Sequence, residues 1–368
     1  MSEDIPPGSS FVHSEEPFRF HRGGELPGVT LAFETWGELN AAGDNAVMIL
    51  TGLSPSAHAA SHLRDPSDGW WEPMIGPSKP LDSDRLFVIC INSLGSCKGS
   101  TGAASINPDT GAPWRLDFPE LTVEDIAAGA SLVLRHLGIE QLLAVVGPSL
   151  GGMSCLAWLQ QNPQGARHFL SISSAAAAEP FAIAIRSLQR ECIVRDPAFQ
   201  DGQYSDDEWP ETGMMLARKL GMMSYRSPQE WAKRFGRLPQ TRYRRRRFGM
   251  DFAIESYLEA AAIKFVRGFD PCCYLYLSRV MDLFDASEGF DSLVAAVAPI
   301  ELQSLLVIGV KTDILWPLHQ QAELDEAFSA NGIATEFKPL NSIQGHDSFL
   351  VDYDRFRPTV GDYFKTIK

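Results

Sequence analysis

The stretch Gly147-Pro148-Ser149-Leu150-Gly151 decides the fold of this chain. It follows the apolar run at 142–146 and precedes a helix-like stretch at 153–160. A strand, G-x-S-x-G and a helix in that order predict a tight turn that holds the Ser149 hydroxyl above the end of a sheet. The same turn leaves the Leu150 N–H at a helix N-terminus, where an oxyanion would bind. The alternative is a glycine-rich turn with an incidental serine.

Short apolar runs recur on both sides of this turn, at 46–50, 86–91, 169–172 and 305–310, with helical stretches between most of them. This alternation predicts an α/β fold with a mostly parallel, doubly wound sheet. The strand-like segments 29–36 and 44–50 are too close for a crossover helix, so that end of the sheet is expected to be antiparallel. Residues 1–25 are expected to be loosely ordered.

The chain has 368 residues, more than the ~250–300 at which a single core stops growing. Between 179 and 298 it is rich in Leu, Met, Ala, Arg and aromatic residues at helical spacing, without a convincing buried strand. We therefore expect residues 1–178 and 299–368 to form the core and residues 179–298 to form an inserted helical lid. The basic run at 242–247 is either a clamp for a phosphorylated cofactor or a solvated loop, and the loop is favoured.

Composition narrows the class of protein. Hydrophobic residues make up 45% and charged residues 21% of the chain, which excludes wholesale disorder. The net charge of −14 argues against general binding to nucleic acid or to anionic membranes. No apolar run approaches the ~18–20 residues of a membrane span, and the N-terminus lacks the pattern of a signal peptide. The six cysteines form no CxxC pair, so we expect a cytoplasmic protein with reduced thiols and no metal.

A nucleophilic serine needs a base, and the base needs an acid that orients it. In folds built around such a turn the chain order is serine, acid, histidine. Three histidines follow the serine: His168 opens a strand, His319 lies in a helix-like stretch, and His346 lies in a polar loop after the strand-like residues 335–339. The late loop position favours His346 as the base, with an exposed loop histidine as the alternative.

The acid should lie at the carboxyl end of the strand at 305–310, where Asp313 stands. Asp313 is favoured over Asp347 because Asp347 is adjacent to the histidine and cannot easily turn back to orient it. The second oxyanion donor should come from the loop after an early strand. The backbone N–H of Leu53 has that position, and a plain turn is the alternative.

Several further blocks resemble the homoserine O-acetyltransferase family of α/β-hydrolase-fold enzymes. They are 92–102, 106–108, 217–221 with 224–225, 255–258 with 269–270, 274–282, 313–315 with Pro317, and 345–350, and the resemblance runs from about residue 17 to residue 360. It implies the α/β-hydrolase fold and a ping-pong acyl transfer from acyl-CoA, a co-substrate, with no bound cofactor. The acyl group would pass through Ser149 to the hydroxyl of an amino acid.

The same resemblance implies roles for two charged residues. Arg218 matches the residue that holds the α-carboxylate of the acceptor, a contact that suits a guanidinium. Asp347 matches the residue that holds its ammonium. The alternative for each is a structural ion pair. The resemblance also implies a homodimer joined through the lid helices.

One departure from the acetyltransferase pattern points to the serine O-succinyltransferase branch of the family. The loop Gly52-Leu53-Ser54-Pro55 and Pro148 differ from the usual small residues, and a stiffer loop beside the serine would shorten the acceptor pocket. A succinyl donor also needs a cation near its far carboxylate. Arg186 is the candidate, and a surface helix arginine is the alternative.

The leading hypothesis is therefore the transfer of succinyl from succinyl-CoA to L-serine, a step of cysteine biosynthesis. The runner-up is acylation of L-homoserine, a step of methionine biosynthesis. An esterase or thioesterase could use the same three residues but would not need Arg218 and Asp347. A catalytically inactive binding module is disfavoured because Ser149, Asp313 and His346 are all present.

Overall fold

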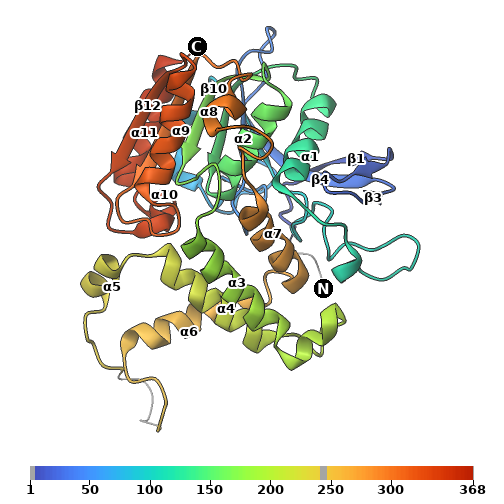
Figure 1. The fold of residues 1–368 in the computed structure, drawn as a ribbon, viewed down its shortest axis with the longest axis vertical. Coiled ribbons are helices and arrows are strands. Elements are labelled where there is room, and N and C mark those ends of the chain that lie inside the picture. Colours follow the sequence, from blue (N-terminus) through green and yellow to red (C-terminus); the bar gives the residue numbers. More distant parts are fainter. Residues whose placement is uncertain (1–4, 241–246, 368) are drawn as a thin grey trace.

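The computed structural model describes residues 5–240 and 247–367. The basic run at 242–247 therefore lies outside the described residues, apart from its last position. Eight strands form one central sheet in the order β1-β4-β8-β5-β9-β10-β11-β12 (Figure 1). Their bounds are Ser10–Ser14, Val29–Trp36, Phe87–Ile91, Ala46–Leu50, Leu142–Pro148, Ala166–Ile172, Ser304–Val310 and Ala334–Leu340 in that order.

The sheet is mostly parallel, as the sequence predicted. From β8 to β12 all neighbouring strands are parallel, whereas β4 is antiparallel to both β1 and β8. The predicted antiparallel end is therefore confirmed. The strands β4 and β5 are not neighbours, however, because β8 lies between them.

The expectation of a loosely ordered start was wrong for the described residues of that segment, 5–25. Strand β1 pairs with β4 along Ser10 to Ser14, and the short strands β2, Phe18–Arg19, and β3, Glu25–Leu26, pair with each other. Strand β1 is an edge strand without a fully buried residue. Its apolar signal is weak for that reason, and its position comes from pairing with β4.

The two faces of the sheet bury different residues of the same strand. On β5, Met48 and Leu50 join the core with α1, α2 and α9, whereas Val47 and Ile49 join the core with α11. This alternation is the two-residue period of a strand that is covered on both faces. The covering helices are α1, Val123–His136, α2, Leu150–Gln161, α9, Leu318–Ala330, and α11, Tyr353–Thr366.

The described helices between β10 and β11 in the chain include a group that lies apart from the sheet, whereas the last of them packs against α9 beside the sheet (Figure 1). They are α3, Pro180–Val194, α4, Glu211–Tyr225, α5, Pro228–Arg234, α6, Ala253–Val266, α7, Pro271–Leu283, and α8, Leu293–Val297. Helix α4 packs against α3 and α6. The remaining short elements are β6, Ile75–Gly76, β7, Leu81–Asp82, and α10, Ser348–Val351. Among the described helices, none has the length and apolar character to span a membrane.

Candidate active site

The turn between β9 and α2 holds Ser149 in a strained backbone conformation, with φ of 55° and ψ of −124°. Glycines permit this turn because the backbone around it is crowded. A Cβ at Gly151 would lie 1.9 Å from the carbonyl oxygen of Leu50, and a Cβ at Gly147 would lie 2.3 Å from the backbone of Gly151. The strand and helix can therefore approach only without side chains at these positions, and the close approach fixes the serine at the end of the sheet.

The structure brings Ser149, His346 and Asp313 together. The Ser149 Oγ lies 2.9 Å from His346 Nε2, and His346 Nδ1 lies 2.8 Å from Asp313 Oδ2. The other carboxylate oxygen of Asp313 accepts the backbone N–H groups of Leu315 and Trp316 at 2.9 and 3.0 Å. A carboxylate held in this way accepts the Nδ1 proton, which leaves Nε2 of His346 free to accept the serine proton.

The environment of His346 favours its charged form. Burial opposes the imidazolium, but the charge of Asp313 and its hydrogen bond outweigh burial and raise the pKa of His346 above the ordinary 6.5. Asp347 adds to the attraction. The arrangement therefore stabilises the imidazolium that forms when His346 takes a proton from Ser149.

The other two histidines after the serine lie elsewhere. His168 Nδ1 is 2.8 Å from Ser304 Oγ within the sheet, and His319 Nε2 is 2.5 Å from Glu179 Oε1 with a side chain that is 61% exposed. Neither approaches the serine through a contact in the described residues, so the choice of His346 agrees with the geometry.

The two residues predicted as oxyanion donors, Leu150 and Leu53, belong to segments that adjoin Ser149. Leu150 is the first residue of α2, so its N–H has no partner within the helix. Leu53 follows β5 in the loop that lines the pocket. A Cβ at the neighbouring Gly52 would lie 3.9 Å from the carbonyl oxygen of Pro148, which places this loop against the turn that carries Ser149.

A pocket of about 130 Å³ opens onto Ser149 and His346. The remaining predicted residues that line it are Gly52, Leu53, Ser54, Pro55, Arg186, Arg218 and Asp347. Sequence reasoning missed the polar and aromatic lining residues Trp70, Gln189, Tyr225, Tyr274 and Trp316. Only Tyr225 and Tyr274 belong to blocks or short motifs that the family resemblance had picked out, and no chemical pattern distinguished them.

The resemblance assigned Arg218 and Asp347 to the acceptor. Both line this pocket, but they differ in whether the charged group has a polar partner. The Arg218 guanidinium lies over the Phe265 ring at 4.4 Å, and its buried Nε has no hydrogen-bond partner in the described part of the chain. Asp347 Oδ2 lies 3.2 Å from Arg226 Nε, and Arg226 also contacts Glu230 at 3.1 Å. Burial raises the pKa of Asp347 although Arg226 opposes the shift. Asp347 thus forms the kind of ion pair that was the alternative for it, with a partner, Arg226, that the sequence did not identify.

A cluster of Glu34, His58 and His62 has ligand atoms close enough together to suit a metal. Both histidines contact Glu34 Oε2 at 2.8 Å, through His58 Nδ1 and His62 Nε2. The His62 Nδ1 accepts the Arg64 N–H at 3.2 Å, so its Nε2 carries the proton that Glu34 accepts. His58 Nε2 contacts the carbonyl oxygen of Ser67 at 3.0 Å, so both nitrogens of His58 are donors. The cluster is thus a closed hydrogen-bond network with a protonated His58, which leaves no free ligand atom on His62.

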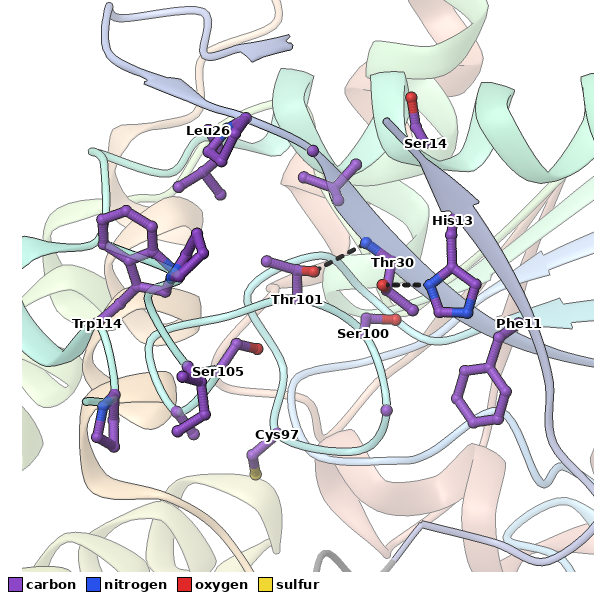
Figure 2. Close-up of a pocket in the computed structure, with 18 of the residues that line it drawn as sticks. Phe11, His13, Ser14, Leu26, Thr30, Cys97, Ser100, Thr101, Ser105 and Trp114 are labelled. Carbon is purple, nitrogen blue, oxygen red and sulfur yellow. Dashed lines mark hydrogen bonds between the residues drawn. The ribbon is translucent and has the colours of Figure 1, made fainter. Parts of the chain in front are cut away.

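A larger hollow of about 1200 Å³ lies between β1, the start of β4 and the loop at 97–115. Figure 2 shows the hydrogen bonds there from the Thr30 N–H to Thr101 and between His13 and Thr30, at 2.8 and 2.7 Å. Its lining shares no residue with the pocket at Ser149. Size therefore does not identify the reactive site in this molecule, whereas the convergence of serine, histidine and two guanidinium groups that each have a nitrogen unpartnered in the described chain does.

The fold and the serine–histidine–aspartate geometry define a class of protein, and comparison with known families agrees. A family model described as alpha/beta hydrolase fold matches residues 45–351. The chain belongs to the α/β-hydrolase fold family.

Individual relatives are more specific. A serine O-succinyltransferase of Stenotrophomonas maltophilia (strain K279a) is 54% identical over 370 aligned positions, which cover 100% of both chains. An L-serine/homoserine O-acetyltransferase of Streptomyces lavendulae is 52% identical over 373 positions, again covering 100% of both. The crystal structure of a homoserine O-acetyltransferase from Bacillus anthracis matches with a TM-score of 0.89 at 26% identity over 96% of each chain. The predicted resemblance to this family and to its serine O-succinyltransferase branch is confirmed.

Proposed function

We propose that this protein transfers a succinyl group from succinyl-CoA to the hydroxyl of L-serine through an ester on Ser149. One observation carries the proposal. The pocket at Ser149 contains two guanidinium groups, those of Arg186 and Arg218, and each has a buried nitrogen without a hydrogen-bond partner in the described chain. A simple ester hydrolase does not need such groups, whereas a dicarboxylic acyl group and an amino-acid acceptor both do. The names of the full-length relatives support the same assignment.

In the first half of the reaction, Ser149 Oγ attacks the thioester carbonyl carbon as its proton passes to His346 Nε2. The N–H groups of Leu53 and Leu150 stabilise the oxyanion that develops. The C–S bond then breaks, the CoA sulfur takes the proton from His346, and an acyl ester remains on Ser149. Asp313 stays ionised throughout and holds the imidazole in position.

In the second half, the hydroxyl of the acceptor gives its proton to His346 and attacks the ester carbonyl. The C–O bond to Ser149 breaks, and the serine regains a proton from His346. Arg218 holds the α-carboxylate of the acceptor, and Asp347, positioned by Arg226, holds its ammonium. Holding the acceptor in this way favours transfer over hydrolysis, because the hydroxyl is oriented toward the ester.

The loop Gly52-Leu53-Ser54-Pro55 limits the depth of the acceptor side, and this favours serine. Homoserine has one more methylene, which a pocket resolves by about 1–3 kcal/mol. Replacing Leu53 and Pro55 together with alanine is expected to raise the use of homoserine relative to serine without changing the preferred donor. A variant whose acceptor ratio stays unchanged in steady-state kinetics would remove this loop from the specificity argument.

A second candidate function is acetyl transfer to L-serine or L-homoserine. It is favoured by the name of the Streptomyces lavendulae relative. The deciding experiment follows CoA release by the purified protein with acetyl-CoA or succinyl-CoA crossed with L-serine or L-homoserine. Succinyl-CoA with L-serine should give the highest kcat/KM. A preference for homoserine would support the runner-up hypothesis, acylation of L-homoserine. CoA release that is equally fast with and without an acceptor would indicate a thioesterase.

We further propose that residues 179–298 act as the lid of a core formed by residues 1–178 and 299–368, in a cytoplasmic homodimer. Large apolar side chains on the outer faces of the lid helices support the dimer. They are Phe181 and Leu188 of α3, Leu216 and Met223 of α4, and Ile263 of α6, each 45–58% exposed. Large exposed apolar side chains on helices that pack against one another are typical of an interface. Light scattering should report twice the chain mass of 40.6 kDa, and a monomer would contradict the proposal.

A further inference from the structure

A buried cluster of three charged residues links α3 to α7 beside the pocket. Arg186 and Arg190 lie one turn apart on α3, and Asp282 comes from α7. The Arg186 Nε lies 2.5 Å from Asp282 Oδ1, and the Arg190 Nη2 lies 2.6 Å from Asp282 Oδ2. The Arg190 Nη1 also donates to Ser278 Oγ at 3.0 Å. One carboxylate is therefore shared by two guanidinium groups.

The charges of this cluster do not cancel. One carboxylate and two guanidinium groups leave a single positive charge. The side chains of Arg186 and Asp282 are only 5% and 8% exposed, and that of Arg190 is 19% exposed. Arginine stays protonated even when buried, so the charge persists. A buried net charge is costly unless something compensates for it. The cluster is thus incomplete without an anion.

The unpartnered nitrogen of Arg186 belongs to a residue that lines the pocket. Asp282 engages Arg186 through Nε, whereas Arg186 Nη2 is buried without a hydrogen-bond partner in the described residues. Arg186 lines the same pocket as Ser149, and the guanidinium carbon lies 5.1 Å from the centre of the Trp316 ring. Asp282 and the Trp316 ring together restrict where the guanidinium can go, and the Nη2 group is left for a ligand.

We propose that Asp282 and Arg190 are positioning residues that determine the choice of acyl donor through Arg186. Asp282 holds the Arg186 guanidinium in place, and Arg190 neutralises Asp282, so that Arg186 keeps its full attraction for the distal carboxylate of a succinyl group. This inference rests on the proposed function. An acetyl group has no distal carboxylate, so the same cluster gives no advantage to acetyl-CoA.

The first test removes the compensating charge. In Arg190→Gln, Asp282 pairs with Arg186 alone, and the net charge of the cluster falls to zero. We expect kcat/KM for succinyl-CoA to fall roughly tenfold, mainly through KM, while kcat/KM for acetyl-CoA is unchanged. Arg186→Leu removes the direct partner and should lower succinyl-CoA use by about 30-fold or more. Arg267→Gln, which breaks a half-exposed ion pair with Glu211 in the same helical region, is the matched control and should change neither donor.

The second test restores the charge. The double variant Asp282→Asn with Arg190→Gln again leaves a single positive charge, on Arg186, and the asparagine oxygen can still accept from Nε. We expect it to recover the preference for succinyl-CoA, as should Arg190→Lys, which keeps the compensating charge. A merely structural role would not produce this recovery. Circular dichroism checks folding, and if Arg190→Gln does not fold, the double variant and Arg190→Lys decide.

The outcomes separate this inference from the proposed function. If the wild-type enzyme prefers succinyl-CoA but Arg190→Gln keeps its donor ratio, or loses both donors equally, the inference is overturned and the function stands. The same holds if the double variant fails to recover the ratio. A wild-type enzyme that does not prefer succinyl-CoA overturns the proposed donor and this inference together.

Discussion

His346 Nε2 lies 2.9 Å from Ser149 Oγ, although 197 positions separate the two residues in the chain. Ser149 lies in the turn after β9, and His346 lies in the loop after β12. Because these strands are parallel, their carboxyl ends lie at the same end of the sheet, which brings the two residues together. A hydroxyl at this distance from an imidazole nitrogen can lose its proton as it attacks a carbonyl carbon.

Replacing Ser149 with alanine is expected to abolish CoA release with every donor. In a serine protease with the same three residue types, loss of the nucleophile lowers kcat by about 10⁶-fold, because the three residues act as a unit. Mass spectrometry of the wild-type protein mixed with succinyl-CoA alone should also show an added succinyl group, and the variant should show none. Retention of most activity in the variant would exclude Ser149 as the nucleophile.

Asp313 and Asp347 are expected to give different defects when changed to asparagine. Asp313→Asn removes the acceptor of the His346 Nδ1 proton. It should slow formation of the acyl-enzyme by about 10⁴-fold, as the same change of aspartate to asparagine does in serine proteases. Asp347→Asn should leave this step nearly intact and raise KM for the amino acid. Rapid-mixing measurements of the CoA burst, followed by steady-state kinetics, separate the two. A burst that fails only in the Asp347 variant would reverse the roles.

The pH dependence of activity should report the environment of His346. The imidazole must be neutral to accept the serine proton, and Asp313 raises its pKa above 6.5 despite burial. Activity should therefore fall as the pH drops through that raised pKa. We expect the acid limb of kcat/KM for succinyl-CoA to have its midpoint above pH 6.5, since this parameter follows ionisations of the free enzyme. A midpoint below 6.5 would contradict the assignment of His346 as the base.

The sequence predicted the parts of the site that depend on local order along the chain. A serine between glycines after an apolar strand, an aspartate after a later strand and a histidine in a late loop can each be placed without knowing the packing. The partners of the charged residues could not be placed in this way. Asp282 reaches Arg186 across 96 positions, and this contact depends on how α7 packs against α3.

The same distinction applies to the fold. Buried parallel strands such as β5 and β9 carry continuous apolar runs, which are visible in the sequence. The edge strand β1 buries no residue fully, so its sequence gives little signal before its partner β4 is known. The network around Glu34 was missed for a related reason, because its members come from β4 and from a loop without regular structure.

The network of Glu34, His58 and His62, with Asp65 Oδ2 3.7 Å from His58 Nδ1, should make the free energy of unfolding depend on pH in a defined direction. Burial opposes the charged form of His58, but hydrogen bonds to Glu34 and Ser67 and the charges of Glu34 and Asp65 outweigh it and raise its pKa above 6.5. The neighbouring His62 also contacts Glu34. A raised pKa means that the folded state holds the proton more tightly than the unfolded state. The stabilisation is therefore complete below pH 6.5 and is lost as the pH rises through the raised pKa of the folded protein.

Urea unfolding of wild type and His58→Gln across this pH range tests the prediction. Removing one partner of a buried charge pair typically costs about 3 kcal/mol or more, so we expect a loss on the order of 3 kcal/mol at pH 6. The difference in unfolding free energy between the two proteins should shrink as the pH rises, because wild type loses the contribution that the variant never had. A difference that is constant with pH, or that grows as the pH rises, would show that His58 is not protonated in the folded protein.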